Sequence, residues 1–414
     1  MSDISRSKFT FISLAANAGL LLPLSVALAS TVGMAASTIY VPSIPDIAAD
    51  FHTSAGAVQL SFAAYLAAMA VGMLVLGPLS DVFGRRSILQ GGLGVCLVGT
   101  LICVISPSIP ILIAARVLQG IGASAGSVVG RAAIKDSYGR EKAARVIAWI
   151  AFLVTILQSL APLLGGQINA LAGWRWAFAF IALLTALTLG VVTCAFPATR
   201  SVRIKERGAA KAVWAYGDVF ANRQFLAYVL AATGAHAGFH VFSAGAPVVF
   251  LRSFGITSTA YGIYAFLPPL GFLVGSTLSG IWRSEVNKMV VIGIALIIQG
   301  GVLLVGSAGA GVATPWSTAI LMALICCGSG VATPSAIAGA LSAEPGKAGT
   351  ASGFMTFSQL AGAAAGTATL TFLPSDSLLA LSIVIFCVGA AGALGYVALI
   401  RSRPNTDPVG LATS

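Results

Sequence analysis

The stretch Gly77-Pro78-Leu79-Ser80-Asp81-Val82-Phe83-Gly84-Arg85-Arg86 decides the fold. Uncharged apolar sequence lies on both sides of it, at 57–76 and 87–105. Each flank has about the ~20 residues that a helix needs to cross a bilayer. The chain is therefore expected to cross, turn in a short polar hairpin and cross back. Arg85 and Arg86 mark the cytoplasmic side, while Gly77 and Gly84 allow close approach and a tight turn.

Composition indicates an integral membrane protein. It is 57% hydrophobic and 8% charged, which is more apolar surface than a soluble protein of this length can bury. The apolar runs are continuous, so they favour transmembrane helices over the alternating strands of a β-barrel. We predict twelve spans, at about 17–41, 56–76, 87–106, 109–130, 146–171, 175–196, 224–250, 259–282, 289–308, 316–341, 349–372 and 377–400.

The basic residues orient these spans. Of the 23 lysines and arginines, only Arg116, Arg175 and Arg252 fall outside the segments on the side of Arg85. This bias predicts that both termini are cytoplasmic. The net charge of +11 thus reflects basic residues that orient the protein in the membrane and attract anionic lipid. Nucleic-acid binding is therefore not expected.

The longest internal polar segment divides the chain in two. We predict an N-terminal six-helix bundle at 1–197, a cytoplasmic linker at 198–222, a C-terminal six-helix bundle at 223–400 and a cytoplasmic tail at 401–414. The fold class is thus an all-α membrane protein of twelve helices in two pseudo-symmetric bundles. Transporters built in this way bind substrate between the halves, near the membrane midplane.

Several motifs resemble those of the major facilitator superfamily. The opening stretch is similar to its loop signature between the second and third helices, with Val82 where a basic residue is common. Arg116-Val-Leu-Gln119-Gly120-Ile-Gly122 resembles its fourth-helix signature, and Ala161-Pro162-Leu-Leu-Gly165-Gly166 resembles the antiporter signature. The run from Ala161 to Gly166 and the run Gly173-Trp-Arg-Trp176 resemble motifs of proton-coupled drug exporters of the Bcr/CflA-like subgroup. The resemblance implies alternating access, with Pro162, Gly165 and Gly166 forming a kinked, closely packed helix. An ordinary packing kink is the alternative.

The resemblance leaves the proton site open. The subgroup often carries an acid in the first helix, where this chain has Thr38-Ile-Tyr40-Val-Pro42. Because the Thr38 hydroxyl does not titrate, the coupling mechanism does not carry over simply. Asp46 is the nearest acid, and it is either functional or a loop or cap residue at the outer rim.

Two further sites contain ionisable residues within spans. An ionisable residue inside a membrane span is a candidate functional residue. Arg116, with Gln119 about one turn away, is either part of the proton or substrate pathway or a structural arginine bonded to backbone carbonyls. His236 and His240 share one helix face, and histidine titrates near neutral pH. They form either a cavity-facing proton or substrate site or a neutral pair that bonds neighbouring helices.

The resemblance also implies a cytoplasmic charge network. Arg131-Ala-Ala-Ile-Lys-Asp136-Ser-Tyr resembles a subgroup signature that closes the fourth helix. Arg131 and Asp136 are expected to join Asp81, Arg85 and Arg86, with Arg145 as a further candidate, and to hold the outward-open state.

No metal-ligand spacing, nucleotide-binding loop or catalytic triad occurs in the sequence, so no metal, cofactor or enzymatic activity is expected. The resemblance predicts a monomer in the bacterial inner membrane that exports small drug-like molecules by proton antiport. The alternatives are a transporter of metabolites or anionic solutes on the same fold and, less favoured, a non-transporting sensor or scaffold.

Overall fold

The computed structural model describes residues 18–138, 140–196, 222–282, 284–344 and 348–401, in which twelve helices have at least 21 residues. The first six are α2 (Ala18–Thr38), α4 (Ala55–Phe83), α5 (Arg85–Ile105), α6 (Ile109–Ser137), α7 (Arg140–Ala172) and α8 (Trp174–Ala195). The other six are α10 (Arg223–Val248), α11 (Ser258–Ile281), α12 (Val286–Gly309), α13 (Pro315–Ala343), α14 (Ala348–Thr369) and α15 (Leu378–Arg401). Short elements join them: η1 (Val41–Ser43), α3 (Ile44–Asp50), η2 (Val249–Ser253) and η3 (Leu370–Phe372).

Each predicted span corresponds to one of these helices, so the predicted all-α membrane fold is confirmed. Among the described residues, eleven stretches are long and apolar enough to cross a membrane. Of the twelve long helices, α14 is the one that is not apolar enough by this measure. It consists largely of glycine, alanine, serine and threonine. It packs against α4 and α10, where small side chains let helices in lipid approach closely.

Local sequence fixes where several helices begin. The Ser54 hydroxyl accepts a hydrogen bond from the Ala57 amide at 3.2 Å, and the Asn222 carbonyl oxygen accepts one from the Phe225 amide at 3.1 Å. Both side chains satisfy a first-turn amide that has no partner within its own helix. Gly84 ends α4 with a φ of 92°, which glycine adopts without a steric penalty. The predicted hairpin thus forms as a turn with a single residue between two long helices.

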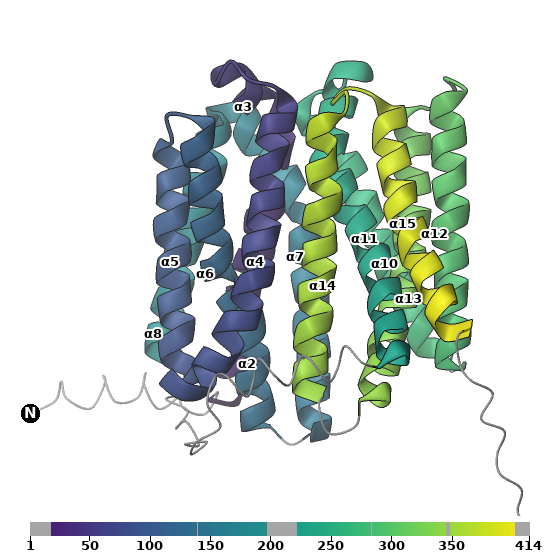
Figure 1. The fold of residues 1–414 in the computed structure, drawn as a ribbon. Coiled ribbons are helices and arrows are strands. Elements are labelled where there is room, and N and C mark those ends of the chain that lie inside the picture. Colours follow the sequence, from purple (N-terminus) through teal and green to yellow (C-terminus); the bar gives the residue numbers. More distant parts are fainter. Residues whose placement is uncertain (1–17, 139, 197–221, 283, 345–347, 402–414) are drawn as a thin grey trace, which may run out of the picture.

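The helices form two groups, which we call the N-terminal group (α2 to α8) and the C-terminal group (α10 to α15). Within the first, α6 packs against α2, α4 and α5. Within the second, α13 packs against α10, α11 and α12. The groups meet where α4 contacts α14 and α7 contacts α11, as Figure 1 shows at the centre of the molecule. The predicted linker lies outside the described residues except for Asn222, and the predicted tail does so from residue 402 on.

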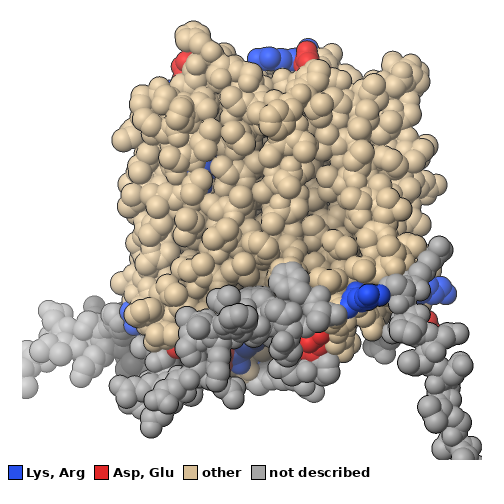
Figure 2. All heavy atoms as spheres, viewed as in Figure 1, with Lys and Arg blue, Asp and Glu red and all other residues tan. Residues whose placement is uncertain are grey.

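The two ends of the bundle differ and are named here by their landmarks. The Gly84 end carries the turn between α4 and α5, and α2 begins there and α15 ends there (Figure 1). The α3 end carries α3 and lies opposite. Figure 2 shows a broad band with almost no charged side chains between the ends. Such a band is what a bilayer requires of the surface that it covers.

Candidate functional site

A cavity of about 340 Å³ lies where the two groups face each other. Its walls come from α2, α6 and α7 on one side and from α10, α11 and α13 on the other. Ser127 and Arg131 lie in the last three turns of α6, which is near the Gly84 end, whereas Phe239 and His240 lie near the middle of α10. The cavity therefore extends from the middle of the bundle toward the Gly84 end.

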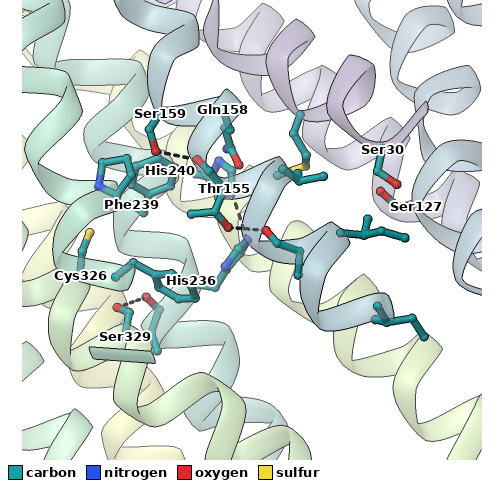
Figure 3. A pocket seen from close by; sticks show the side chains of 18 of the residues that line it. Ser30, Ser127, Thr155, Gln158, Ser159, His236, Phe239, His240, Cys326 and Ser329 are labelled. Atoms are coloured by element: carbon teal, nitrogen blue, oxygen red, sulfur yellow. Dashed lines mark hydrogen bonds between the residues drawn. The ribbon is translucent and has the colours of Figure 1, made fainter. Parts of the chain in front are cut away.

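His236 and His240 lie together in the cavity wall (Figure 3). Their Nε2 atoms are 3.1 Å apart, so one ring donates a hydrogen bond and the other accepts it. His240 is fully buried, and its Nδ1 has no hydrogen-bond partner among the described residues. Its ring also approaches Phe62 of α4, with 6.1 Å between centroids. The pair thus touches both the cavity and the opposite helix group.

The facing wall carries a row of polar side chains on α7 that was not predicted from the sequence as one site. Thr155, Gln158 and Ser159 line the cavity opposite the histidines (Figure 3). The Thr155 hydroxyl donates to the Ala151 carbonyl at 2.8 Å, and the Ser159 hydroxyl donates to the Thr155 carbonyl at 2.6 Å. The spacing of three and four residues would have identified this face, but serine and threonine in spans commonly bond only their own helix.

At the α3 end the two groups close on each other. Gln59 Nε2 of α4 donates to the Ala244 carbonyl of α10 at 3.3 Å. Gly56 of α4 lies against the Thr371 backbone of η3, and Gly166 of α7 lies against the Ser258 backbone of α11. These backbone approaches need glycine, because a Cβ at either position would press on the opposing chain. The structure therefore shows the cavity with its α3 side closed.

The antiporter-like run lies beside this closure. Pro162 is inside the continuous helix α7, and Gly165 packs against the carbonyl of Ile39 at the end of the first span. Pro162 and Thr38 line a second, very small space together with Gln158. The Thr38 hydroxyl donates to the Met34 carbonyl at 3.5 Å, a long hydrogen bond and its only one to the described part of the chain. The first span thus meets α7 at the motif that resembles drug exporters.

Arg116 lies outside the cavity, fully buried within the N-terminal group. Its Nη1 donates to the Ala36 carbonyl at 2.9 Å and to Gln119 Oε1 at 2.5 Å. The guanidinium carbon stands 4.5 Å from the Tyr40 ring centre and 4.0 Å from that of Tyr65. No carboxylate is within ion-pair distance among the described residues. Its partners are therefore a carbonyl, an amide and aromatic faces.

The charge network at the Gly84 end is smaller than predicted. Arg85 forms ion pairs with Asp81 at 2.5 Å and with Asp136 at 3.0 Å. Arg86 instead donates to the Thr193 carbonyl of α8. Arg131 Nε donates to the Ser127 carbonyl at 2.8 Å, and its side chain lines the cavity. The two ion pairs join α4, α5 and α6, so they stabilise the N-terminal group and do not bridge the two groups.

Asp46 lies at the α3 end, away from the cavity. It is exposed in the first turn of α3 and accepts a hydrogen bond from Asn169 Nδ2 at 2.5 Å. Its neighbour Asp50 forms an ion pair of 2.8 Å with Arg175. These contacts connect α3 to α7 and α8.

Comparison with known proteins identifies the family. Residues 26–367 match the sequence model of the Major Facilitator Superfamily. The chain belongs to this superfamily.

Relatives within the superfamily include proteins named for drug resistance. The chain is 29% identical to multidrug resistance protein D of Escherichia coli over 95% of its own length and 99% of that protein's. It is 28% identical to the chloramphenicol resistance protein CraA of Acinetobacter baumannii over 75% of its length and 76% of CraA's. A solved structure of the Escherichia coli xylose transporter XylE superposes with a TM-score of 0.71 at 14% identity, covering 94% of this chain and 98% of XylE's. The predicted resemblance to the superfamily and its drug exporters is thereby confirmed, and XylE supports the superfamily fold alone.

Proposed function

We propose that this superfamily member exports small drug-like molecules from the bacterial cytoplasm by proton antiport, as a monomer in the inner membrane. The similarity to multidrug resistance protein D along almost the whole of both chains carries the proposal. The cavity between the two groups supports it, because about 340 Å³ lies in the range of small-molecule sites. Its walls are mainly apolar, with a few polar groups, as such sites usually are.

The arrangement of the two ends supports alternating access. With the Gly84 end cytoplasmic, as the basic residues predict, the observed state offers the cavity toward the cytoplasm and is closed at the α3 end. Opening requires the hydrogen bond from Gln59 to Ala244 to break, Gly56 to separate from Thr371 and Gly166 to separate from Ser258. These contacts are small and lack ion pairs between described residues, so rocking of one group against the other breaks few strong interactions.

His236 and His240 are the proposed proton site. No described carboxylate lines the cavity, and the other titratable groups in its walls are Arg131 of α6 and Cys326 of α13. In the neutral pair one ring already donates its Nε2 proton to the other ring, so a proton taken up from solution binds at the unprotonated Nδ1 of the donating ring. A second proton would place two positive charges on adjacent turns, so the pair takes up one proton at a time. Binding and release of that proton changes the charge of the wall that faces the substrate.

The test is transport in vesicles with an imposed pH gradient. The protein carrying both His236→Gln and His240→Gln should lose the pH dependence of efflux and keep substrate binding at constant pH. His52→Asn is the matched control, because His52 is exposed beyond the α3 helix and has a φ of 50°, which asparagine tolerates. Unchanged pH dependence in the double variant would show that the proton binds elsewhere.

A further inference from the structure

The cavity has an unbalanced charge that the proposed function does not require. Its ionisable lining residues are Arg131, His236, His240 and Cys326, with no aspartate or glutamate among those described. The carboxylate nearest to Arg131 in sequence, Asp136, is bound to Arg85 at 3.0 Å. Among the wall residues that the structure describes, the only permanent charge is thus positive.

The Arg131 side chain is held so that its terminal nitrogens remain available. Its Nε donates to the carbonyl of Ser127, one turn earlier on α6, at 2.8 Å. Nη1 and Nη2 have no hydrogen-bond or ion-pair partner in the part of the chain that the structure describes. A guanidinium presents its donors in a planar fork that matches a carboxylate. The side chain is therefore positioned to receive an anionic group.

The other polar groups in the cavity are suited to bind the uncharged part of a ligand. Gln158 and Thr155 of α7 line it together with the two histidines of α10 (Figure 3). Phe239 and Phe272 contribute aromatic surface on the side of the C-terminal group. These groups can hold an apolar, hydrogen-bonding molecule. They supply no negative charge to compensate a cation, and an uncompensated charge in an apolar cavity is strongly disfavoured.

We propose that the cavity selects amphipathic molecules by charge, binding anions most tightly, neutral molecules next and lipophilic cations poorly, with Arg131 as the residue that sets this order. The inference rests on the cavity being the substrate site of the proposed function. It does not depend on proton coupling, because it concerns binding at equilibrium. It narrows the substrate class to weak acids and uncharged compounds of a size that fits the cavity.

The test uses three probes that share a naphthylpropyl body and differ in the charge of the head group: 4-(1-naphthyl)butyrate, its carboxamide and the 3-(1-naphthyl)propyl-trimethylammonium ion. Binding to the full-length protein in zwitterionic lipid nanodiscs is measured by titration calorimetry at constant pH, with empty nanodiscs as the blank. We expect the carboxylate to bind at least tenfold more tightly than the cation, with the carboxamide between them. Equal or tighter binding of the cation, or no binding of any probe, would overturn the proposal.

Variants assign the effect to one residue. Arg131→Gln should lower the affinity for the carboxylate to about that for the carboxamide, and Arg131→Glu should reverse the order of anion and cation. Arg145→Gln is the matched control: it removes an exposed cation from the Gly84 end of α7 that does not line the cavity. A loss of carboxylate preference in this control would show that general surface charge is responsible. A correct binding order without gradient-driven transport would contradict only the proposed function.

Discussion

Gly166 offers a direct test of how the α3 end closes. A Cβ at this position would lie 3.1 Å from the carbonyl carbon of Ser258 and closer still to its carbonyl oxygen. The opposing atoms are backbone on α11, so they cannot rotate away. Gly166→Ala should therefore raise the free energy of the state in which the α3 end is closed. Once α7 and α11 separate, the added methyl group no longer meets this obstacle.

The expected magnitude follows from the cost of overpacking. Inserting a methyl group against a well-packed surface costs about 1–3 kcal/mol, and a difference of that size changes a two-state equilibrium about 5–150-fold. Gly166→Ala should shift the population by this factor toward the state that is open at the α3 end. Distances between spin labels at Leu171 and Phe372, which are 85% and 87% exposed on opposite groups, should then include a longer component.

Two alanine variants separate this effect from general destabilisation. Gly165→Ala meets Ile39 within its own helix group, so it should lower thermal stability without lengthening the distance between the labels. Gly94→Ala on α5 meets nothing within 4 Å, so it should neither lengthen the distance nor lower thermal stability. If Gly166→Ala folds and gives the same distance distribution as the parent, the contact with Ser258 does not control closure.

Two further variants test the polar contacts of the N-terminal group. Arg116→Lys keeps the charge but loses the guanidinium between two tyrosine rings and at least one of its two hydrogen bonds, so it should reduce the unfolding free energy by about 2–4 kcal/mol. Denaturation in detergent measures this, and a loss below about 0.5 kcal/mol would contradict it. Asp136→Asn removes an ion pair whose carboxylate is 49% exposed, and the same assay should give a loss of at most about 1 kcal/mol. A loss above about 2 kcal/mol would show that this pair is coupled to more of the fold than α5 and α6.

The sequence by itself determined the spans and the contacts within single helices. Twenty-residue apolar runs predicted the helices, and the glycine before Arg85 predicted the turn. Spacings of three and four residues predicted that Arg116 approaches Gln119 and that His236 approaches His240, because helix geometry brings such residues together. The hydrogen bonds of 2.5 Å and 3.1 Å at these pairs agree with that reasoning.

Only the tertiary structure decided which helix faces meet. In lipid, the outward and inward faces of a span are both apolar, so hydropathy does not mark the buried side. In an apolar window of 18 residues, 72% of the window is buried inside the protein for the span that contains α10, but only 22% for α7. The contact of Asp46 with Asn169 spans 123 residues of sequence. The place of Arg131 in the cavity wall, rather than in the Arg85 network, likewise depends on how α6 packs against its neighbours.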